Sequence, residues 1–158
     1  MDALLEFAMA VKAMHRELER ANNEAMRPFG LTGPQADALV AIAISEPVSL
    51  KELGGLLIAE AGAPTRLVER LVEAGLVERR VAEHDRRGVS LSLTPHGQRV
   101  LKKVMRAREQ MLAAGRQAVA GHELEPTLEL LLHLLSASPL GEVISRRREL
   151  TKGEDGPA

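Results

Sequence analysis

Cationic side chains are unevenly spread along this sequence, and their position indicates which chemistry the chain could perform. The whole chain carries 21 Lys and Arg against 22 Asp and Glu, a net charge of −1. Between Ala61 and Arg106, however, ten Lys and Arg stand against five Asp and Glu. Such a local excess favours binding to a polyanion such as duplex DNA. A solvated charged surface explains this excess equally well. The choice between the two depends on which helices and strands carry the cations.

Two helices joined by a turn are predicted between Ser49 and Gly75. Ser49 and Glu52 have the S-x-x-E spacing of a capping box, and the short helix that they begin should end near Ile58. A second helix should begin at Gly62 or Ala63 and end at Gly75, where glycine adopts the left-handed conformation without steric cost. Its three- and four-residue spacing points Leu67, Val68, Leu71 and Ala74 inward and leaves Thr65, Arg66, Glu69, Arg70 and Glu73 outside.

A β-hairpin is predicted directly after these helices. The apolar period changes from 3.6 to 2, which indicates strands at 76–81 and 89–94 joined by a polar tip at 82–88. Helix, turn, helix and basic-tipped hairpin together form a winged helix-turn-helix, a DNA-reading module. The fold class is therefore mostly α with a small β-hairpin wing.

The helices on either side of this module have the pattern of helix pairing. Residues 2–27 carry apolar side chains alternately four and three residues apart, and His15 and Asn22 interrupt that seam. For His15 we favour a core or interface position over contact with a ligand. Residues 124–135 are apolar nearly all round, so this helix must be buried on several sides, and in a small chain a second subunit is the expected cover.

The remaining segments carry shorter sequence signals for secondary structure. Thr32 and Gln35 form a second capping box, Val48 should pair briefly with the wing, and Thr94 should cap a helix that continues to about Ala120. The C-terminal extension, 139–158, begins with a possible short helix and ends in a disordered tail. It contains three consecutive arginines, Arg146, Arg147 and Arg148. They could touch DNA, although a solvated charge cluster is the better interpretation.

Composition excludes several classes of protein. The chain has no cysteine, which removes disulfides and thiol chemistry, and it has too few aromatic residues for base-stacking platforms. Its five histidines lack metal-ligand spacing, and no phosphate loop or nucleophile elbow is present. With neither a signal peptide nor a membrane span, we expect a soluble cytoplasmic protein without metal or cofactor, and not an enzyme.

The sequence resembles the MarR family of bacterial transcription regulators. The fragments that carry the resemblance are Arg66-Leu67-Val68-Glu69-Arg70-Leu71, Gly75-Leu76-Val77-Glu78-Arg79, Asp85-Arg86-Arg87, and Ser92-Leu93-Thr94 with Gly97. The resemblance extends more loosely over 1–137. It implies a single winged-helix domain over 1–138, with a DNA-binding part at about 32–94 and dimerisation helices at about 2–27 and 95–137. It also implies a homodimeric repressor that binds a pseudo-palindromic operator and is released by a small ligand.

The resemblance assigns roles to individual residues. The family reads the major groove with the segment that is 62–70 here, and Arg66 is the leading base contact because its guanidinium can bond O6 and N7 of guanine together. Arg70 should pair with Asp85 or a phosphate, and Arg79 is a weaker candidate. The full set of expected DNA contacts is Ser49, Lys51, Gly62, Ala63, Thr65, Arg66, Arg70, Asp85, Arg86 and Arg87. The last three form the wing tip, which should enter the minor groove, unless it is an ordinary polar hairpin tip.

One segment departs from the family pattern. Gly62, Ala63 and Pro64 stand where the family usually has hydroxyl-bearing and β-branched residues. Either the operator is unusual or DNA affinity is reduced. The alternative function is a winged-helix protein that has lost operator binding and acts through protein contacts. The effector is not indicated; we expect an aliphatic, Met-lined pocket, with His15 as a weak candidate for ligand contact.

Overall fold

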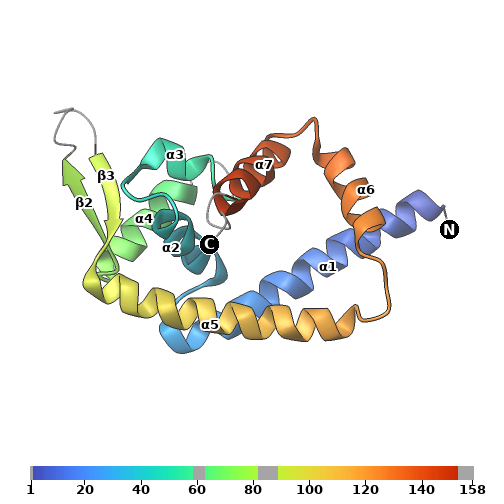
Figure 1. The fold of residues 1–158 in the computed structure, drawn as a ribbon, viewed down its shortest axis with the longest axis horizontal. Coiled ribbons are helices and arrows are strands. Elements are labelled where there is room, and N and C mark those ends of the chain that lie inside the picture. The colour runs from blue at the N-terminus through green and yellow to red at the C-terminus, as the bar shows by residue number, and fades with distance from the viewer. Residues whose placement is uncertain (1, 59–62, 82–88, 153–158) are drawn as a thin grey trace.

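The computed structural model describes residues 2–58, 63–81 and 89–152, and its fold is the predicted winged helix-turn-helix with long flanking helices (Figure 1). Its elements are α1 (Ala3–Met26), η1 (Arg27–Phe29), α2 (Gly33–Ala43), β1 (Val48–Ser49), α3 (Leu50–Gly54), α4 (Ala63–Glu73), β2 (Val77–Val81), β3 (Val89–Leu93), α5 (Pro95–Ala118), α6 (Glu125–Leu135) and α7 (Pro139–Lys152). Within these ranges, no helix combines the length and apolar character needed to cross a membrane.

The winged-helix head consists of α2, α3, α4 and a three-stranded antiparallel sheet in the order β1-β3-β2. Val48 pairs with Leu91 on one side of β3, which confirms the brief strand beside the wing, and Arg79 pairs with Leu91 on the other. Side chains from all of these elements meet in one core. Its fully buried members include Leu39, Ile42, Leu53, Val68, Leu71 and Leu91.

Local sequence signals set the helix ends of the head. In both predicted capping boxes each side chain bonds the other residue's backbone: Thr32 with Gln35, and Ser49 with Glu52. Gly75 has φ +68°, and the Leu76 N–H donates to the Leu71 carbonyl across the end of α4. These hydrogen bonds satisfy backbone groups that a helix end leaves open.

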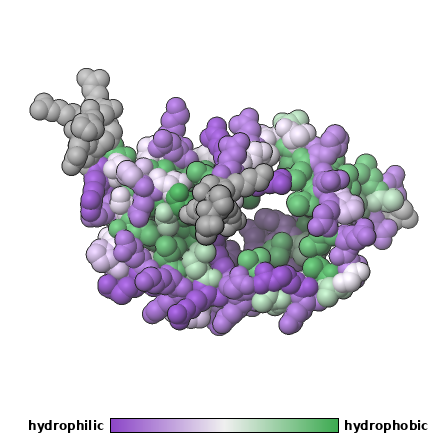
Figure 2. Space-filling model, in the orientation of Figure 1, coloured by the Kyte–Doolittle hydropathy of each residue, from purple (hydrophilic) through white to green (hydrophobic). Residues whose placement is uncertain are grey.

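The flanking helices extend to one side of the head. α1 and α5 contact each other, and α6 and α7 return toward the head, so the subunit surrounds an opening (Figures 1 and 2). Apolar side chains on α1 and α6 remain exposed, among them Leu4 at 74% and Leu134 at 58%. No residue of α6 is buried in the single subunit.

Three predictions need correction. α3 ends at Gly54 and not near Ile58, because the Gly55 and Leu56 N–H groups bond carbonyls three residues back and tighten the chain into a turn. Ala74 is exposed and not inward, because it follows the end of α4. The short helix expected in the C-terminal extension is α7, 14 residues long, and its Arg147 is partly buried and not solvated. The predicted disordered tail lies outside the described residues.

Candidate nucleic-acid interface

The outer face of α4 is a row of polar side chains held out by a buried apolar face. Val68 and Leu71 are completely buried in the head core, and the helix turns Thr65, Arg66, Glu69, Arg70 and Glu73 to the surface, as predicted. Among the described residues, Arg66 makes no ion pair. Its guanidinium is therefore available to an external acceptor, whereas the helix behind it is fixed by packing.

Arg70 pairs with a neighbour on its own helix. Its Nη1 lies 3.1 Å from Glu73 Oε2, one turn along the same helix, and both side chains are exposed. Its predicted partner was Asp85 or a phosphate, and Asp85 lies outside the described residues. Because an exposed ion pair of this kind contributes little free energy, a phosphate could displace Glu73 at small cost.

At the start of α3, Ser49 and Lys51 occupy different surroundings. Ser49 Oγ accepts a hydrogen bond from the Glu52 N–H at 3.2 Å, and Glu52 Oε2 accepts one from the Ser49 N–H at 2.9 Å. Hydrogen bonds with Ser49 lower the pKa of Glu52 from its ordinary value. The Ser49 hydroxyl oxygen is therefore engaged, but its proton can still be donated outward, and the Lys51 side chain is exposed.

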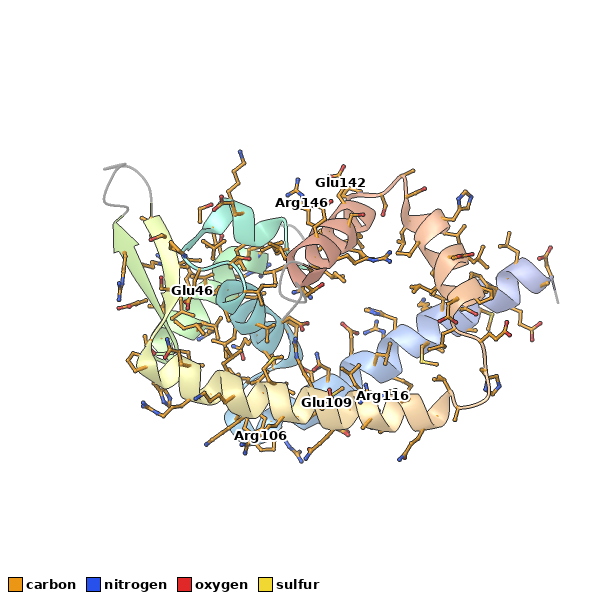
Figure 3. All side chains as sticks on the ribbon, in the orientation of Figure 1. Glu46, Arg106, Glu109, Arg116, Glu142 and Arg146 are labelled. Atoms are coloured by element: carbon orange, nitrogen blue, oxygen red, sulfur yellow. The ribbon has the colours of Figure 1, made fainter. Side chains whose placement is uncertain are left out.

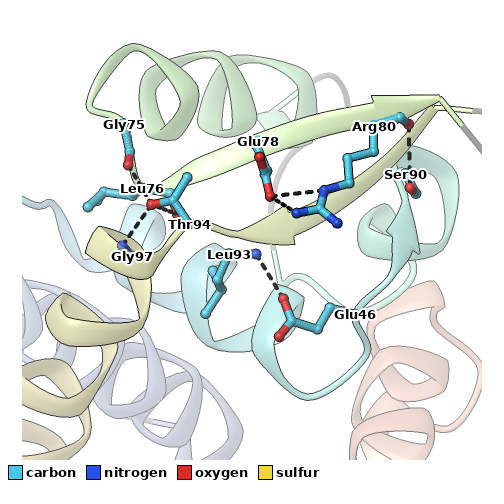
Figure 4. Close-up of polar contacts among 9 residues, drawn as sticks. All are labelled: Glu46, Gly75, Leu76, Glu78, Arg80, Ser90, Leu93, Thr94 and Gly97. Atoms are coloured by element: carbon cyan, nitrogen blue, oxygen red, sulfur yellow. Dashed lines mark hydrogen bonds and ion pairs between the residues drawn. The ribbon is translucent and has the colours of Figure 1, made fainter.

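The base of the wing is tied to the head and to α5 by polar contacts (Figure 4). Glu46 Oε2 accepts a hydrogen bond from the Leu93 N–H at 2.8 Å. Thr94 Oγ1 donates to the Gly75 carbonyl at 2.7 Å and accepts from the Gly97 N–H at 2.9 Å. One side chain thus joins the end of α4, the end of β3 and the first turn of α5.

Several predicted contacts lie outside the described residues: Gly62 and the tip residues Asp85, Arg86 and Arg87. Ala63 is the first residue of α4, as the position of Pro64 suggested, since proline is tolerated in a first helical turn. On β2, Arg79 is exposed, and the neighbouring Arg80 pairs through Nε with Glu78 at 2.9 Å. The wing assignment therefore rests on its described strands and remains a prediction at the tip.

His15, for which we favoured a core or interface position over ligand contact, is exposed on α1 with Nε2 3.5 Å from Glu19 Oε2. It is therefore not in the core of the subunit, and its place in an interface stays a prediction. A hollow of about 430 Å³ does lie between α7 and the head. Its described lining mixes aliphatic and charged side chains and contains no methionine: Ser45, Pro47, Val48, Glu52, Leu56, Arg146, Glu149 and Leu150. The expected effector pocket stays a prediction.

Sequence reasoning missed the contacts that hold the head against the long helices. Asp37 on α2 pairs with Arg108 on α5, 71 residues away, and Arg147 on α7 reaches the Leu56 carbonyl. The sequence shows Glu46 only as a residue at the end of a helix, and it does not reveal the hydrogen bond from the Leu93 N–H. No local pattern distinguishes these side chains from solvated ones, because their partners are distant in the sequence.

The comparisons with known proteins agree with this geometry. A sequence model of the MarR family matches residues 29–88, from the end of η1 to the residue before β3. An uncharacterized HTH-type transcriptional regulator of Bacillus subtilis (strain 168), YwoH, is 32% identical over 102 residues, 62% of this chain and 74% of that protein. The chain belongs to the MarR family of transcription regulators.

Two further MarR-like proteins extend the similarity beyond the head. The organic hydroperoxide resistance transcriptional regulator of B. subtilis is 28% identical over 123 residues, 78% of this chain and 82% of that protein. The crystal structure of a mutant Escherichia coli MarR complexed with operator DNA superposes with a TM-score of 0.70 at 27% identity, covering 84% of this chain and 94% of that one. The relatives named here are regulators and not enzymes.

Proposed function

We propose that this MarR-family regulator is a homodimeric repressor that binds a pseudo-palindromic duplex operator and is released by a small ligand. The observation that carries the proposal is the outer face of α4, where Arg66 stands exposed on a helix anchored by Val68 and Leu71. The solved complex of E. coli MarR with operator DNA supports this use of the fold. Since its proposed target is chromosomal DNA, we place the protein in the cytoplasm and assign it no catalytic step.

In the proposed complex, each subunit inserts α4 into the major groove. Arg66 bonds a base edge, because a guanidinium can reach guanine O6 and N7 together. Thr65 contacts a phosphate or a base edge, Arg70 contacts a phosphate, and Ser49 and Lys51 hold the DNA backbone at the start of α3. The wing tip, with Arg86 and Arg87, enters the minor groove, where narrow A·T tracts attract arginine.

Dimerisation follows from the apolar surface that one subunit leaves open. α6 has no buried residue, and Leu124, Leu128, Leu130 and Leu134 are each about half exposed. Soluble proteins rarely leave such a continuous apolar surface uncovered. We infer that a second copy covers α6 and α1, which places two α4 helices on one face of the duplex. Half-sites should then lie about 10 bp apart, one turn of DNA.

The alternative, a protein that has lost operator binding, is weaker. It rests on the missing hydroxyls at Gly62, Ala63 and Pro64, whereas the exposed face of α4 keeps Thr65 and Arg66 in position. Nothing in the geometry of the described head favours a protein partner over DNA.

Selection of bound sequences from random duplex DNA tests the proposal. The protein should enrich a palindrome, and Arg66→Ala should relax the preference at one base position in each half-site, with a loss of about 1–3 kcal/mol per contact. Arg106→Ala is the matched control, because it removes the same charge from the outer side of α5 (Figure 3). Enrichment of no sequence by the wild-type dimer would refute operator binding.

A further inference from the structure

The C-terminal helix α7 is tightly connected to α6, the helix that we infer to be covered by the second subunit. Only Ser136–Ser138 separate the two helices. Ser138 Oγ donates to the Leu135 carbonyl at 2.9 Å, and the Gly141 N–H donates to the Ser138 carbonyl at 3.0 Å. A Cβ on Gly141 would lie 3.0 Å from the Leu135 carbonyl carbon, so the corner is closely packed. The corner therefore leaves little freedom between α6 and α7.

From that corner α7 runs back to the head and ends against the C-terminal end of α3 (Figure 1). Arg147 Nε donates to the Leu56 carbonyl at 2.6 Å, across 91 residues of sequence. Arg146 lies beside it on α7, and a side chain added at Gly55 would meet the Arg146 guanidinium. Val143, one turn earlier, is buried. Two arginines thus dock α7 on the segment that follows α3.

This contact fits an electrostatic need of α3. The last carbonyls of a helix lack intrahelical donors, and the C-terminal end carries partial negative charge. Leu56 comes just after the Gly54–Gly55 turn in which α3 ends, and its carbonyl accepts from Arg147. The Leu56 carbonyl lies just beyond α3, so the guanidinium satisfies a turn carbonyl and places a compensating positive charge beside the C-terminal end of the helix.

Asp37 supports Arg147 from a third element. Burial lowers the pKa of Arg147 from its ordinary value, and the negative charge of Asp37 opposes that shift. Asp37 itself pairs with Arg108 of α5. One carboxylate on α2 therefore attracts an arginine from α5 and an arginine from α7. Among the described residues, Arg147 Nη2 has no hydrogen-bond partner, so the bond from Nε is the directional contact.

We propose that Arg147 is a positioning residue for DNA recognition: it fixes the segment 55–58 after α3 against α7, and so sets the recognition helix relative to the dimer. The inference rests on the proposed function above. α3 packs on α4, and α7 continues from α6, so the contact completes a path from the subunit interface to the DNA-reading face. Without it, each head should rotate more freely against the dimer, and half-site spacing should be read less strictly.

Two measurements on the full-length chain test Arg147→Ala against its neighbour Arg148→Ala, which removes the same charge from an exposed position. The first is hydrogen exchange without DNA. Because hydrogen bonds to charged groups are among the stronger ones, amides at 50–58 should exchange about tenfold faster, or more, in Arg147→Ala and unchanged in Arg148→Ala. The second is binding to the selected palindromic duplex and to versions with one base pair inserted or deleted between half-sites.

The expected result is that Arg147→Ala loses preference for the selected spacing, whereas the wild type and Arg148→Ala keep it. A purely structural defect would weaken binding to all three duplexes equally, and that outcome would overturn the positioning role, as would unchanged exchange at 50–58. If the wild type selects no palindrome, the proposed function fails first, and the positioning role fails with it. Should Arg147→Ala not fold, Arg147→Lys keeps the charge but not the guanidinium geometry and should show the same two changes, smaller in size.

Discussion

The joint between the wing and α5 allows a sharp test of the packing described here. Gly97 is buried in the first turn of α5, and its N–H bonds Thr94 Oγ1. A Cβ added at Gly97 would lie 2.9 Å from the Leu76 carbonyl carbon and closer still to its oxygen. Both neighbours are backbone atoms that are held by β2 and the Thr94 contacts, so neither can rotate away. The change Gly97→Ala must therefore move α5 away from the head.

The magnitude follows from two opposing effects. Overpacking of this kind costs about 1–3 kcal/mol, and replacing glycine by alanine within a helix returns about 0.5–1 kcal/mol. We expect a net loss of about 1–2 kcal/mol. Gly115, on the same helix, is the control, because a Cβ there meets nothing within 4 Å in the subunit. Gly115→Ala should gain only the higher helix propensity of alanine, which adds about 0.5–1 kcal/mol to the free energy of unfolding.

Thermal unfolding at one fixed protein concentration measures the difference, since the stability of a dimer depends on concentration. A free-energy difference of about 1.5–3 kcal/mol corresponds to midpoints about 3–12 °C apart for a chain of this size, at about 2–4 °C per kcal/mol. Gly97→Ala should melt below the wild type and Gly115→Ala above it. If Gly97→Ala were as stable as the wild type, the close approach of α5 to Leu76 would not exist in solution.

Three other outcomes are expected. Replacing Arg86 and Arg87 of the predicted wing tip by alanine should leave folding and dimerisation intact, lower operator affinity by about 1–3 kcal/mol per engaged contact, and flatten the salt slope by about 0.9 per lost phosphate contact; an unchanged affinity across a salt series would exclude the tip from the interface. Sedimentation at micromolar concentration should show a dimer, with an interface on the order of 2,000 Å² or more, and a folded monomer would contradict the interpretation of α6. Ser49→Ala should destabilise the protein by about 0.5–2 kcal/mol in denaturant unfolding. Because the pKa of Glu52 is lowered in the folded state, the cap contributes at neutral pH and is lost as the pH falls through the lowered value; a variant as stable as the wild type at neutral pH would argue against the cap.

The fold of the head could be predicted because the ends of its helices and strands are determined by residues that are close in the sequence. The capping boxes at Thr32 and Ser49 and the helix stop at Gly75 each act within a few residues, and the change of period after Gly75 marks the strands. The same locality explains the error at the end of α3. Apolar Leu56 and Leu57 continue a helical spacing, but the glycine pair before them ends the helix, and both leucines enter the core from the turn.

The candidate site was predictable on α4 and less so elsewhere. Arg66 follows from an amphipathic period that fixes which face is buried. Arg147 does not follow from any period, because three consecutive arginines on a terminal segment have the composition of a solvated cluster. What buries Arg147 is the return of α7 to the head, and that return depends on the corner at Ser136–Ser138 and on the distant Leu56 carbonyl.

The continuous α5 gives the molecule a lever arm. A helix of 24 residues is about 36 Å long, at about 1.5 Å per residue. A tilt of only about 5° at its Thr94 end moves the far end by about 3 Å, close to the ~3.4 Å rise of one base pair. The contacts of the Thr94 hydroxyl and of Gly97 fix the angle of α5. They therefore also limit how far the half-sites can shift along the DNA. A small displacement between the long helices is enough to bring two half-sites out of phase, without any rearrangement inside either head.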